Sequence, residues 1–376
     1  MSARQYTAAD IEVLKGLGQV RRRPVMYVGS LCSRGLHELL TILLDNSIDE
    51  ARAGHARRLT LTLGADGSVR AEDDGRGIPV TLHERADQPT LELVFTMLGA
   101  CYCGCENSPG HRRSLYGLGM AVVNALSEWL VVETNREGMT YRLRFERGEL
   151  VGQLECLGSS QAQGTSIHFL PDRSIFRPDA RLDRARLFGE VEGLAALVPG
   201  FTFGLVDERE PNRLSRELCC PRGLADLVQS LAEQPRLALP IVVGPTRAAW
   251  PDDDAQAELR LALQADDCER EHVIGFVNLQ RSDEGTHVHG LLRGLDLGFR
   301  DAAEQLGLRS PARRPRGLVA VLAVDIPWPQ FEGSTRECLA SPPAEAIVER
   351  VARAAIPRWA RAHPREAAAL LRRCPE

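Results

Sequence analysis

The stretch from Gly35 to Ala53 reads G-L-H-E-L-L-T-I-L-L-D-N-S-I-D-E-A-R-A, and its spacing predicts an α-helix. Apolar residues recur at intervals of three and four, so we expect one buried stripe, which consists of Leu36, Leu39, Leu40, Leu43, Leu44 and Ile48. A second face is polar except at one position, and its members are Glu38, Ile42, Asn46, Asp49 and Glu50. From this stretch alone, Ile42 can also be interpreted as a widening of the apolar stripe beside an ordinary solvated face.

A second informative segment, Glu72 to Val80, reads E-D-D-G-R-G-I-P-V. It follows β-rich runs at Leu59–Leu63 and Ser68–Ala71, so we expect a strand that ends in a tight turn. The two glycines permit close approach to the backbone. A solvated surface turn is the plain alternative, but it explains poorly an acidic pair, two spaced glycines and a proline together.

A third segment, Tyr116 to Ser127, reads Y-G-L-G-M-A-V-V-N-A-L-S and predicts a glycine loop that opens an apolar helix. Such a loop offers backbone N–H groups and the positive end of a helix dipole to a phosphate. The G-x-G pattern alone is weak evidence, because similar turns start helices that bind nothing. Gly164-Thr165 precedes an alternating strand and is informative only in combination.

In this order, the segments D-N-S-I-D-E, D-D-G-R-G-I-P, G-L-G and G-T resemble the motifs of the GHKL (Bergerat-fold) ATPases, the group of gyrase, heat-shock chaperones, histidine kinases and MutL. Further stretches are similar to gyrase B and topoisomerase IV ParE subunits, and the resemblance covers nearly the whole chain. These are V-L-K-G-L-G-Q-V-R-R-R-P-V-M-Y-V-G from Val13, V-V-N-A-L-S from Val122 and G-T-H-V-H-G from Gly285. The chain has no G-x-x-x-x-G-K-[ST] pattern, so a P-loop mechanism is not supported.

The resemblance implies an α+β chain of two domains. Residues 1–220 would form a GHKL α/β sandwich with an N-terminal arm, and residues 221–376 a ribosomal S5-like transducer domain. The length of 376 residues and the 44% hydrophobic content are consistent with two globular domains. We expect exposed loops at Pro245–Asp254 and Arg309–Arg316, and helix from Ala344 to Arg373 with breaks at its prolines.

The sequence has no apolar run of about 18 residues and no leader pattern, so we expect a cytoplasmic protein without membrane association. Its 10 irregularly spaced cysteines are then expected to be reduced thiols. Cys101, Cys103 and Cys105 lie before the glycine loop, in the lid of the family pattern. A metal or redox role is the alternative for these three, but no second Cys or His pair lies nearby to complete a closed site.

The resemblance further implies an ATP site with Mg²⁺. Asn46 matches the Mg²⁺ ligand, and its amide oxygen is the hard donor that this ion prefers. Asp73 matches the aspartate that accepts a hydrogen bond from the adenine amino group, with Thr165 in support. The other matches are an ion pair at the edge of the base pocket, its wall, the phosphate loop and an arginine outside the pocket, namely Glu50, Arg76, Gly77, Ile78, Pro79, Gly117, Leu118, Gly119 and Arg136.

The family places its general base one helical turn before Asn46, and this chain has Ile42 there. A hydrocarbon cannot accept a proton, and loss of a positioned base costs about 10² to 10⁴ in rate. Glu38 lies one turn further back, where gyrase subunits carry a histidine, so it is a candidate relocated base that acts through a water molecule. The alternative is that Glu38 simply faces solvent.

Two further matches concern closure of the protein around nucleotide. The family's transducer loop ends in Gln-Thr-Lys, and this chain has Ser334, Thr335 and Arg336, so Arg336 is the implied γ-phosphate sensor. The guanidinium of arginine keeps the positive charge of a lysine, but its planar group has a different geometry. The alternative is a loop arginine that binds no ligand. Tyr6 matches the arm that crosses between subunits, which implies a homodimer, unless the first residues are a frayed terminus.

DNA is a further possible partner, bound without sequence preference through phosphates. The candidate arginines are Arg309, Arg313, Arg314, Arg316, Arg350, Arg353, Arg358, Arg361 and Arg365. An ordinary solvated surface explains them equally well, and the net charge of -5 argues against a generally basic nucleic-acid binder. No E-G-D-S-A-like motif occurs, so we do not expect this chain by itself to cleave DNA. A fragment of a longer protein is one interpretation, but Ile42 in place of the general base favours a stand-alone paralogue.

The leading hypothesis is a gyrase-B/ParE-like module that binds Mg-ATP and closes as a nucleotide-gated dimer, with hydrolysis weak or absent because of Ile42. One alternative is an ATP-hydrolysing topoisomerase subunit that uses Glu38 as its base. The other is a nucleotide-free pseudoenzyme that serves as an adaptor for a gyrase or topoisomerase partner.

Overall fold

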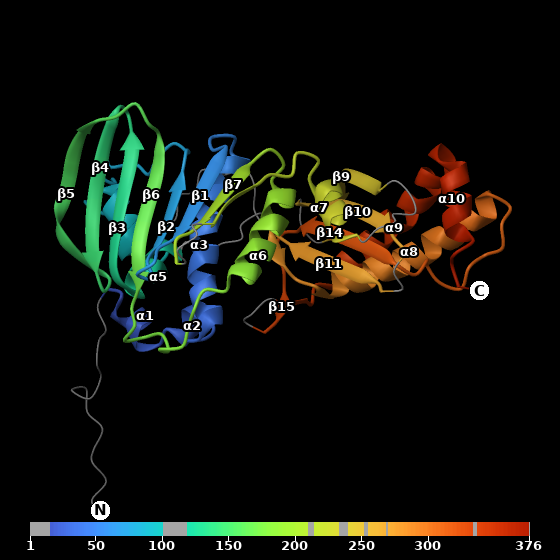
Figure 1. The fold of residues 1–376 in the computed structure, drawn as a ribbon, viewed down its shortest axis with the longest axis horizontal. Helices are drawn as coiled ribbons and strands as arrows, with labels where there is room; N and C mark the ends of the chain where they lie inside the picture. Colours follow the sequence, from blue (N-terminus) through green and yellow to red (C-terminus); the bar gives the residue numbers. More distant parts are fainter. Residues whose placement is uncertain are drawn as a thin grey trace, which may run out of the picture. The chain divides into compact units, whose positions relative to one another are not determined.

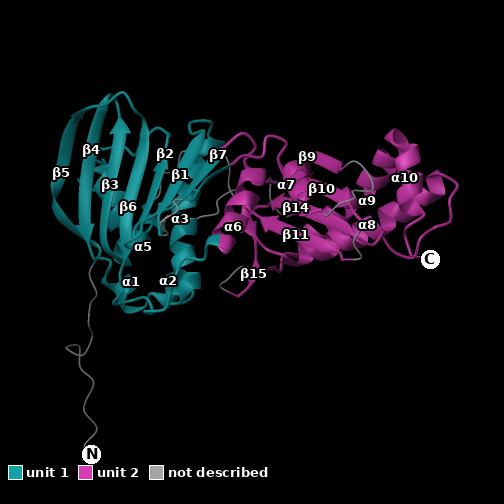
Figure 2. Cartoon of the chain, viewed as in Figure 1, with its two compact units in different colours: residues 1–103, 114–184, 203–217 teal, residues 104–113, 185–202, 218–376 magenta. Residues whose placement is uncertain are grey.

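The computed structural model describes residues 16–100, 119–209, 214–232, 240–251, 255–267, 270–333 and 337–375. The chain forms two compact units, which comprise residues 1–103, 114–184 and 203–217, and residues 104–113, 185–202 and 218–376 (Figure 2). Each unit combines mixed sheet with helices, so the predicted α+β class is confirmed. Among the helices in these described ranges, none has the length and apolar character needed to span a bilayer.

The first unit is built on an eight-stranded sheet with the strand order β5-β4-β3-β6-β2-β1-β7-β8 (Figure 1). The strands are β1 (Arg58–Leu63), β2 (Val69–Asp73), β3 (Ser127–Arg136), β4 (Met139–Glu146), β5 (Glu149–Ser159), β6 (Gly164–Pro171), β7 (Thr202–Asp207) and β8 (Leu214–Leu218). Pairing is antiparallel from β5 through β4, β3, β6 and β2 to β1. In β1 every second residue is buried, as expected of a strand with one face on the core.

Helices of the first unit cover part of this sheet. They are α1 (Gly18–Arg22), α2 (Val25–Val28), α3 (Ser33–Arg52), α4 (Thr90–Thr96) and α5 (Gly119–Ala125). The six-residue apolar stripe predicted for α3 is entirely buried, which confirms its helical period. Arg21 connects α1 to the end of α5 and to the residue after β6, because its guanidinium donates to the Ala125 carbonyl and to the buried Asp172 carboxylate, both at 2.6 Å.

The second unit contains a five-stranded sheet with the order β12-β11-β14-β10-β9 and a small sheet with the order β13-β16-β15. The strands are β9 (Ile241–Ala249), β10 (Gln256–Ala265), β11 (His272–Val277), β12 (Gln280–Arg281), β13 (Glu284–Gly285), β14 (Leu318–Asp325), β15 (Phe331–Glu332) and β16 (Cys338–Leu339). The helices are α6 (Arg184–Leu197), α7 (Leu224–Leu231), α8 (Thr286–Gln305), α9 (Pro342–Ala362) and α10 (Pro364–Leu371). The parallel pair β11 and β14 is connected through α8.

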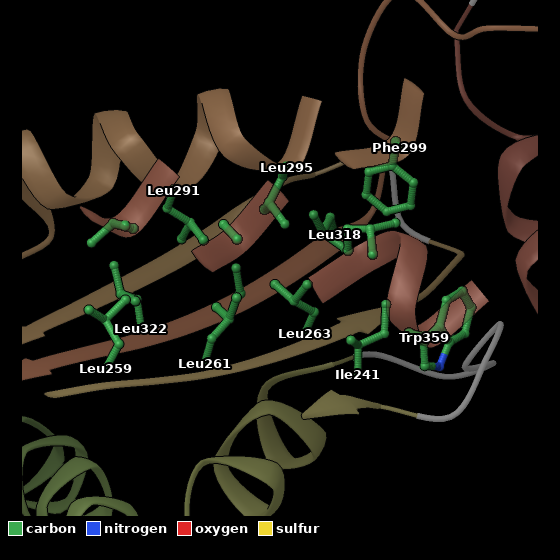
Figure 3. Packing of buried hydrophobic residues seen from close by; sticks show 14 of the residues in the cluster. Ile241, Leu259, Leu261, Leu263, Leu291, Leu295, Phe299, Leu318, Leu322 and Trp359 are labelled. Carbon is green, nitrogen blue, oxygen red and sulfur yellow. The ribbon is translucent and has the colours of Figure 1, made fainter. Parts of the chain in front are cut away.

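The core of the second unit lies between the sheet and α8 with α9. Leucines of β10 and β14 point toward Leu291, Leu295 and Phe299 of α8 (Figure 3). All three of these α8 side chains are at most 1% exposed. Full burial of a side chain of this size contributes about 1.5–3 kcal/mol, so this cluster is the main stabilising feature of the unit.

Two sequence expectations for the second unit were partly wrong, although the expected helix break at Pro364 is confirmed, since α9 ends at Ala362 and α10 begins at Pro364. Pro245 lies within β9, where a β-bulge against β10 and the edge position of the strand accommodate a residue without an N–H. Pro357 lies inside α9 and does not end it. The flanking Ile356 and Trp359 are buried in the core cluster, so packing holds the helix where local propensity would break it.

A line of glycines in α8 sets how closely α9 approaches. A Cβ atom at Gly290 would lie 2.3 Å from the Glu345 carbonyl oxygen, and one at Gly294 would lie 2.5 Å from the Glu349 carbonyl oxygen. These distances are below any ordinary contact between carbon and oxygen. Only glycine therefore permits this packing of the two helices.

We expect Gly294→Ala to lower the free energy of unfolding by about 1–3 kcal/mol, because the new methyl group overpacks the α8–α9 contact. Urea denaturation followed by circular dichroism measures the change. The matched control is Gly189→Ala in α6 of the same unit, where nothing lies within 4 Å of a new Cβ. Helix propensity predicts that this control stabilises by about 0.5–1 kcal/mol. A Gly294→Ala variant as stable as the wild type would contradict the packing described.

Candidate functional site

The first unit positions a carboxylate where α3, β2 and β6 meet. Asp73 is the last residue of β2, and three groups donate hydrogen bonds to it. The Ser47 hydroxyl of α3 donates to Oδ2 at 2.9 Å. The backbone N–H groups of Gly75 and Thr165 donate to Oδ1 at 2.9 Å and 3.3 Å. These residues, with Glu50 and Arg76 beside them, are called the Asp73 site below.

Burial and hydrogen bonding act on Asp73 in opposite directions. Partial removal from water raises the pKa of its carboxyl group, and the three donors offset only part of this effect. Ser47 and Thr165 are 3% and 5% exposed, whereas Asp73 itself is half-buried. The carboxylate is therefore fixed by the protein, while the residue as a whole keeps part of its surface exposed.

An ion pair lies beside this carboxylate. The Arg76 guanidinium donates two hydrogen bonds to Glu50, from Nε at 3.0 Å and from Nη2 at 2.7 Å, and the Arg76 backbone N–H adds a third at 3.1 Å. Desolvation alone would raise the pKa of Glu50, but the hydrogen bonds from Arg76 outweigh it and the pKa is lowered. Glu50 is therefore a stable anion that ties the end of α3 to the turn after β2.

Glycine is required at two points of the turn region. Gly164 has φ +124°, and a Cβ there would lie 1.9 Å from the Asp73 carbonyl oxygen. Gly77 has φ +74°, and a Cβ there would lie 2.6 Å from the carbonyl oxygen of Asn135. Both positions combine a backbone conformation that favours glycine with a close backbone approach.

Strand β3 holds the far side of the same turn. Arg136 donates from Nη1 to the Gly77 carbonyl at 2.9 Å, and Thr134 Oγ1 donates to the Ile78 carbonyl at 3.1 Å. Thr134 is fully buried and pairs with Thr165 of β6. The turn that carries Arg76 is thus anchored both to α3 and to β3. Pro79 continues it with a half-buried side chain.

The polar face of α3 carries the remaining described candidates. Glu38 is exposed, and Ile42 and Asn46 are both half-buried. Ile42 therefore differs from the apolar stripe of the same helix, whose six members are at most 8% exposed. It lies on the face that Glu38 and Asn46 share rather than within the core. Gly119, the described end of the glycine loop, begins α5.

His37 precedes Glu38 but does not share its face. Its ring is 1% exposed, and Nε2 accepts a hydrogen bond from the Asp183 backbone N–H at 2.9 Å. This histidine therefore supports the packing of α3 and does not substitute for a residue at position 38 or 42.

Several candidates lie outside the described residues. They are Tyr6, Gly117, Leu118, Arg336 and the cysteines Cys101, Cys103 and Cys105. Within the described ranges, no group of three or more His, Cys, Asp or Glu side chains is arranged to hold a metal ion.

Sequence reasoning missed Ser47 and Thr134. Ser47 directly follows Asn46 and lies four residues after Leu43 and four before Ala51, so it interrupts an apolar row along α3, which is a weak signal of a buried hydrogen bond. Thr134 carries no signal of its own, because its role depends on which strand lies next to β6.

Several of the arginines considered for DNA already have partners in the protein, among them Arg309, Arg314, Arg316 and Arg353. Arg314 is held by Glu271 and Asp296, and Arg353 forms a two-pronged ion pair with Asp301. Arg350, Arg358, Arg361 and Arg365 are exposed on α9 and α10.

The sheet of the first unit has a hollow of about 410 Å³ on its outer face, and the residues that line it do not indicate a particular ligand. Arg142 pairs there with Glu133 at 2.6 Å, and Arg70 pairs with Glu72 at 3.0 Å. These paired charges leave no clear preference for an anion or a cation.

Comparison with known proteins identifies the family to which the chain belongs. Residues 32–175 match the family "Histidine kinase-, DNA gyrase B-, and HSP90-like ATPase", and residues 223–376 match the family "DNA gyrase B". The type 2 topoisomerase B subunit of Aquifex aeolicus is 38% identical over 92% of this chain and 44% of its own length. The DNA gyrase B subunit of Caulobacter vibrioides is 34% identical over 100% of this chain and 48% of its own length. The chain spans about half the length of the curated relatives it matches.

Solved structures agree along nearly the whole chain. The 43K ATPase domain of Thermus thermophilus gyrase B, solved with an aminocoumarin, has a TM-score of 0.78 and 30% identity, and the match covers 95% of this chain and 93% of that one. The gyrase B subunit of Myxococcus xanthus has a TM-score of 0.73 and 30% identity, with 95% and 99% covered. The chain therefore belongs to the gyrase B/ParE-like family of GHKL ATPases and carries the family's GHKL and transducer regions.

Proposed function

We propose that this chain binds Mg-ATP at the Asp73 site, closes as a nucleotide-gated homodimer, and hydrolyses ATP slowly or not at all. One observation carries the proposal. Helix α3 contributes Ser47 to a well-ordered carboxylate site, while the same helix presents Ile42 at the position of the family's general base. The groups suited to binding are retained, and the group suited to activating water is replaced.

The hydrogen bonds of Asp73 support adenine binding. An ionised carboxylate offers about four lone-pair directions, and donors in the described part of the chain use three of them. The remaining acceptor direction suits an N–H donor such as the exocyclic amino group of adenine. The partial exposure of Asp73 supports access for such a group.

Asn46 supports the metal part of the proposal. Its side-chain amide makes no hydrogen bond within the described part of the chain, so the amide oxygen is available as a hard ligand. Mg²⁺ in nucleotide sites commonly takes one or two protein ligands, phosphate oxygens and several waters. A single Asn46 oxygen fits that pattern, and the bound ion would neutralise phosphate charge. Gly117, Leu118 and Gly119 are proposed to hold the phosphates, with Arg336 as the γ-phosphate sensor.

Hydrolysis needs a group that orients water and accepts its proton. The Ile42 side chain can do neither, and the loss is worth about 10² to 10⁴ in rate, or about 3–5 kcal/mol of barrier. Glu38 is the candidate relocated base. It lies four residues before Ile42, about 6 Å along the helix, and is exposed to bulk water. We therefore favour a nucleotide-gated switch over a working ATPase.

The remaining parts of the proposal concern assembly. Tyr6 in the N-terminal arm is proposed to close over the nucleotide of a second copy. DNA is proposed to contact the exposed arginines of α9 and α10 through its phosphates, with an affinity that falls steeply with salt. A gyrase or topoisomerase subunit is the proposed partner for any reaction on DNA.

We expect Asp73→Asn to weaken binding of a non-hydrolysable ATP analogue about tenfold or more, because the amide replaces one acceptor oxygen with a donor. Isothermal titration calorimetry measures the affinity. The matched control is Asp66→Asn in the turn between β1 and β2, which changes the same group of an aspartate that is hydrogen-bonded to Ser68. Equal affinity of Asp73→Asn and wild type would show that the base does not bind at Asp73.

We expect Ile42→Glu to raise steady-state phosphate release about 10² to 10⁴-fold, because it restores a carboxylate at the base position. Ile42→Gln is the control, since glutamine has nearly the same shape as glutamate but cannot accept the proton of the attacking water. Glu38→Gln should leave the wild-type rate unchanged. Measurable wild-type turnover that Glu38→Gln abolishes would overturn the switch and favour the ATPase.

A further inference from the structure

We propose that Ser47 determines base specificity: its hydroxyl keeps Asp73 a pure hydrogen-bond acceptor, and the site thereby selects 6-amino over 6-oxo purine nucleotides. The inference rests on the proposed function, namely nucleotide binding at Asp73. It goes further because it assigns the choice of base to a residue of α3 that need not touch the base.

The geometry distinguishes Ser47 from the other donors to Asp73. Oδ1 is occupied by the backbone N–H groups of Gly75 and Thr165, which no substitution of side chain removes. Oδ2 accepts from the Ser47 hydroxyl at 2.9 Å. Ser47 is 3% exposed, so water does not compete for this contact. Within the described residues, Ser47 is the one side chain that donates to Asp73.

Two effects push Asp73 toward its neutral form. Partial burial is the larger, and the nearby negative charge of Glu50 acts in the same direction. Glu50 is itself bound by Arg76, which brings a positive charge beside it. The three hydrogen bonds oppose this tendency, because each stabilises the ionised form. Removal of one donor therefore raises the pKa of Asp73 further and increases its neutral fraction.

The protonation state decides which base the site accepts. An ionised Asp73 only accepts hydrogen bonds, so it pairs with a 6-amino group and repels a 6-oxo oxygen. A neutral Asp73 carries an O–H that can donate to a 6-oxo oxygen. Without the Ser47 hydroxyl, Oδ2 has no protein donor in the described residues and is free to carry that proton. The site should then lose its preference for the amino base.

The test compares two nucleotides that differ at the 6-position, ADP and inosine diphosphate, by isothermal titration calorimetry with Mg²⁺ present. The use of diphosphates removes any contribution of hydrolysis. For wild type we expect a clear preference for ADP. For Ser47→Ala we expect the ratio of ADP affinity to inosine diphosphate affinity to fall about tenfold. For Ser47→Thr, which keeps the hydroxyl, we expect this ratio to stay close to that of the wild type.

The matched control is Ser68→Ala. Ser68 is 5% exposed, and its hydroxyl donates to the Asp66 carboxylate at 2.6 Å, so the variant removes the same kind of contact in the same unit. We expect no change in the affinity ratio. Thermal unfolding of each variant reports whether the fold is retained.

A second measurement on the wild type needs no variant. Protonation of Asp73 at lower pH should reduce the ratio of ADP affinity to inosine diphosphate affinity, and the reduction should begin at higher pH in Ser47→Ala. A ratio that is independent of pH in wild type, or an equal loss of both affinities in Ser47→Ala, would overturn the role of Ser47. Binding of neither nucleotide by wild type would instead overturn the proposed function itself.

Discussion

A half-buried carboxylate that is stabilised by three separate parts of the chain organises this site. Removal of Asp73 from water is unfavourable unless donors replace the lost hydration, and these donors come from α3, from the turn after β2 and from β6. The relative positions of these three elements are therefore coupled to one charge. The glycine at position 164 is part of the same constraint, because any side chain there would collide with the Asp73 backbone. The Glu50–Arg76 pair adds a second link between α3 and the turn.

The two faces of helix α3 have different roles. Its apolar stripe holds it on the core, and its polar face meets the site. Ile42 lies on the polar face and is half-buried, so its replacement of a carboxylate changes the chemistry available without disturbing the stripe. His37 is buried on another face and accepts a hydrogen bond from the Asp183 backbone. Under the proposed function, this division would let a member of the gyrase B/ParE-like family keep a base-binding site while Ile42 stands in place of the group that activates water.

Much of the fold could be predicted because it is encoded locally. The period of the α3 stripe and the alternation in β1 follow from residues a few positions apart, and the family resemblance supplied the arrangement of the two regions. Contacts across the fold could not be predicted in this way. Ser47 reaches Asp73 only because α3 packs beside β2, and Thr134 matters only because β3 lies next to β6. The predictions at Pro357 and Pro245 were wrong because the local preference of proline was overridden. Tertiary packing keeps α9 continuous at Pro357, and a bulge in β9 accommodates Pro245.

The most direct test of the central claim measures nucleotide binding and phosphate release in the same samples of the unmodified chain. Protein is titrated with Mg-ATP, bound nucleotide is determined at equilibrium, and released phosphate is followed over several hours. The account predicts saturable binding of one nucleotide per chain with phosphate release close to the protein-free background. Saturable binding accompanied by sustained turnover would contradict the claim that Ile42 removes the hydrolytic step, and the absence of binding would contradict the assignment of the Asp73 site.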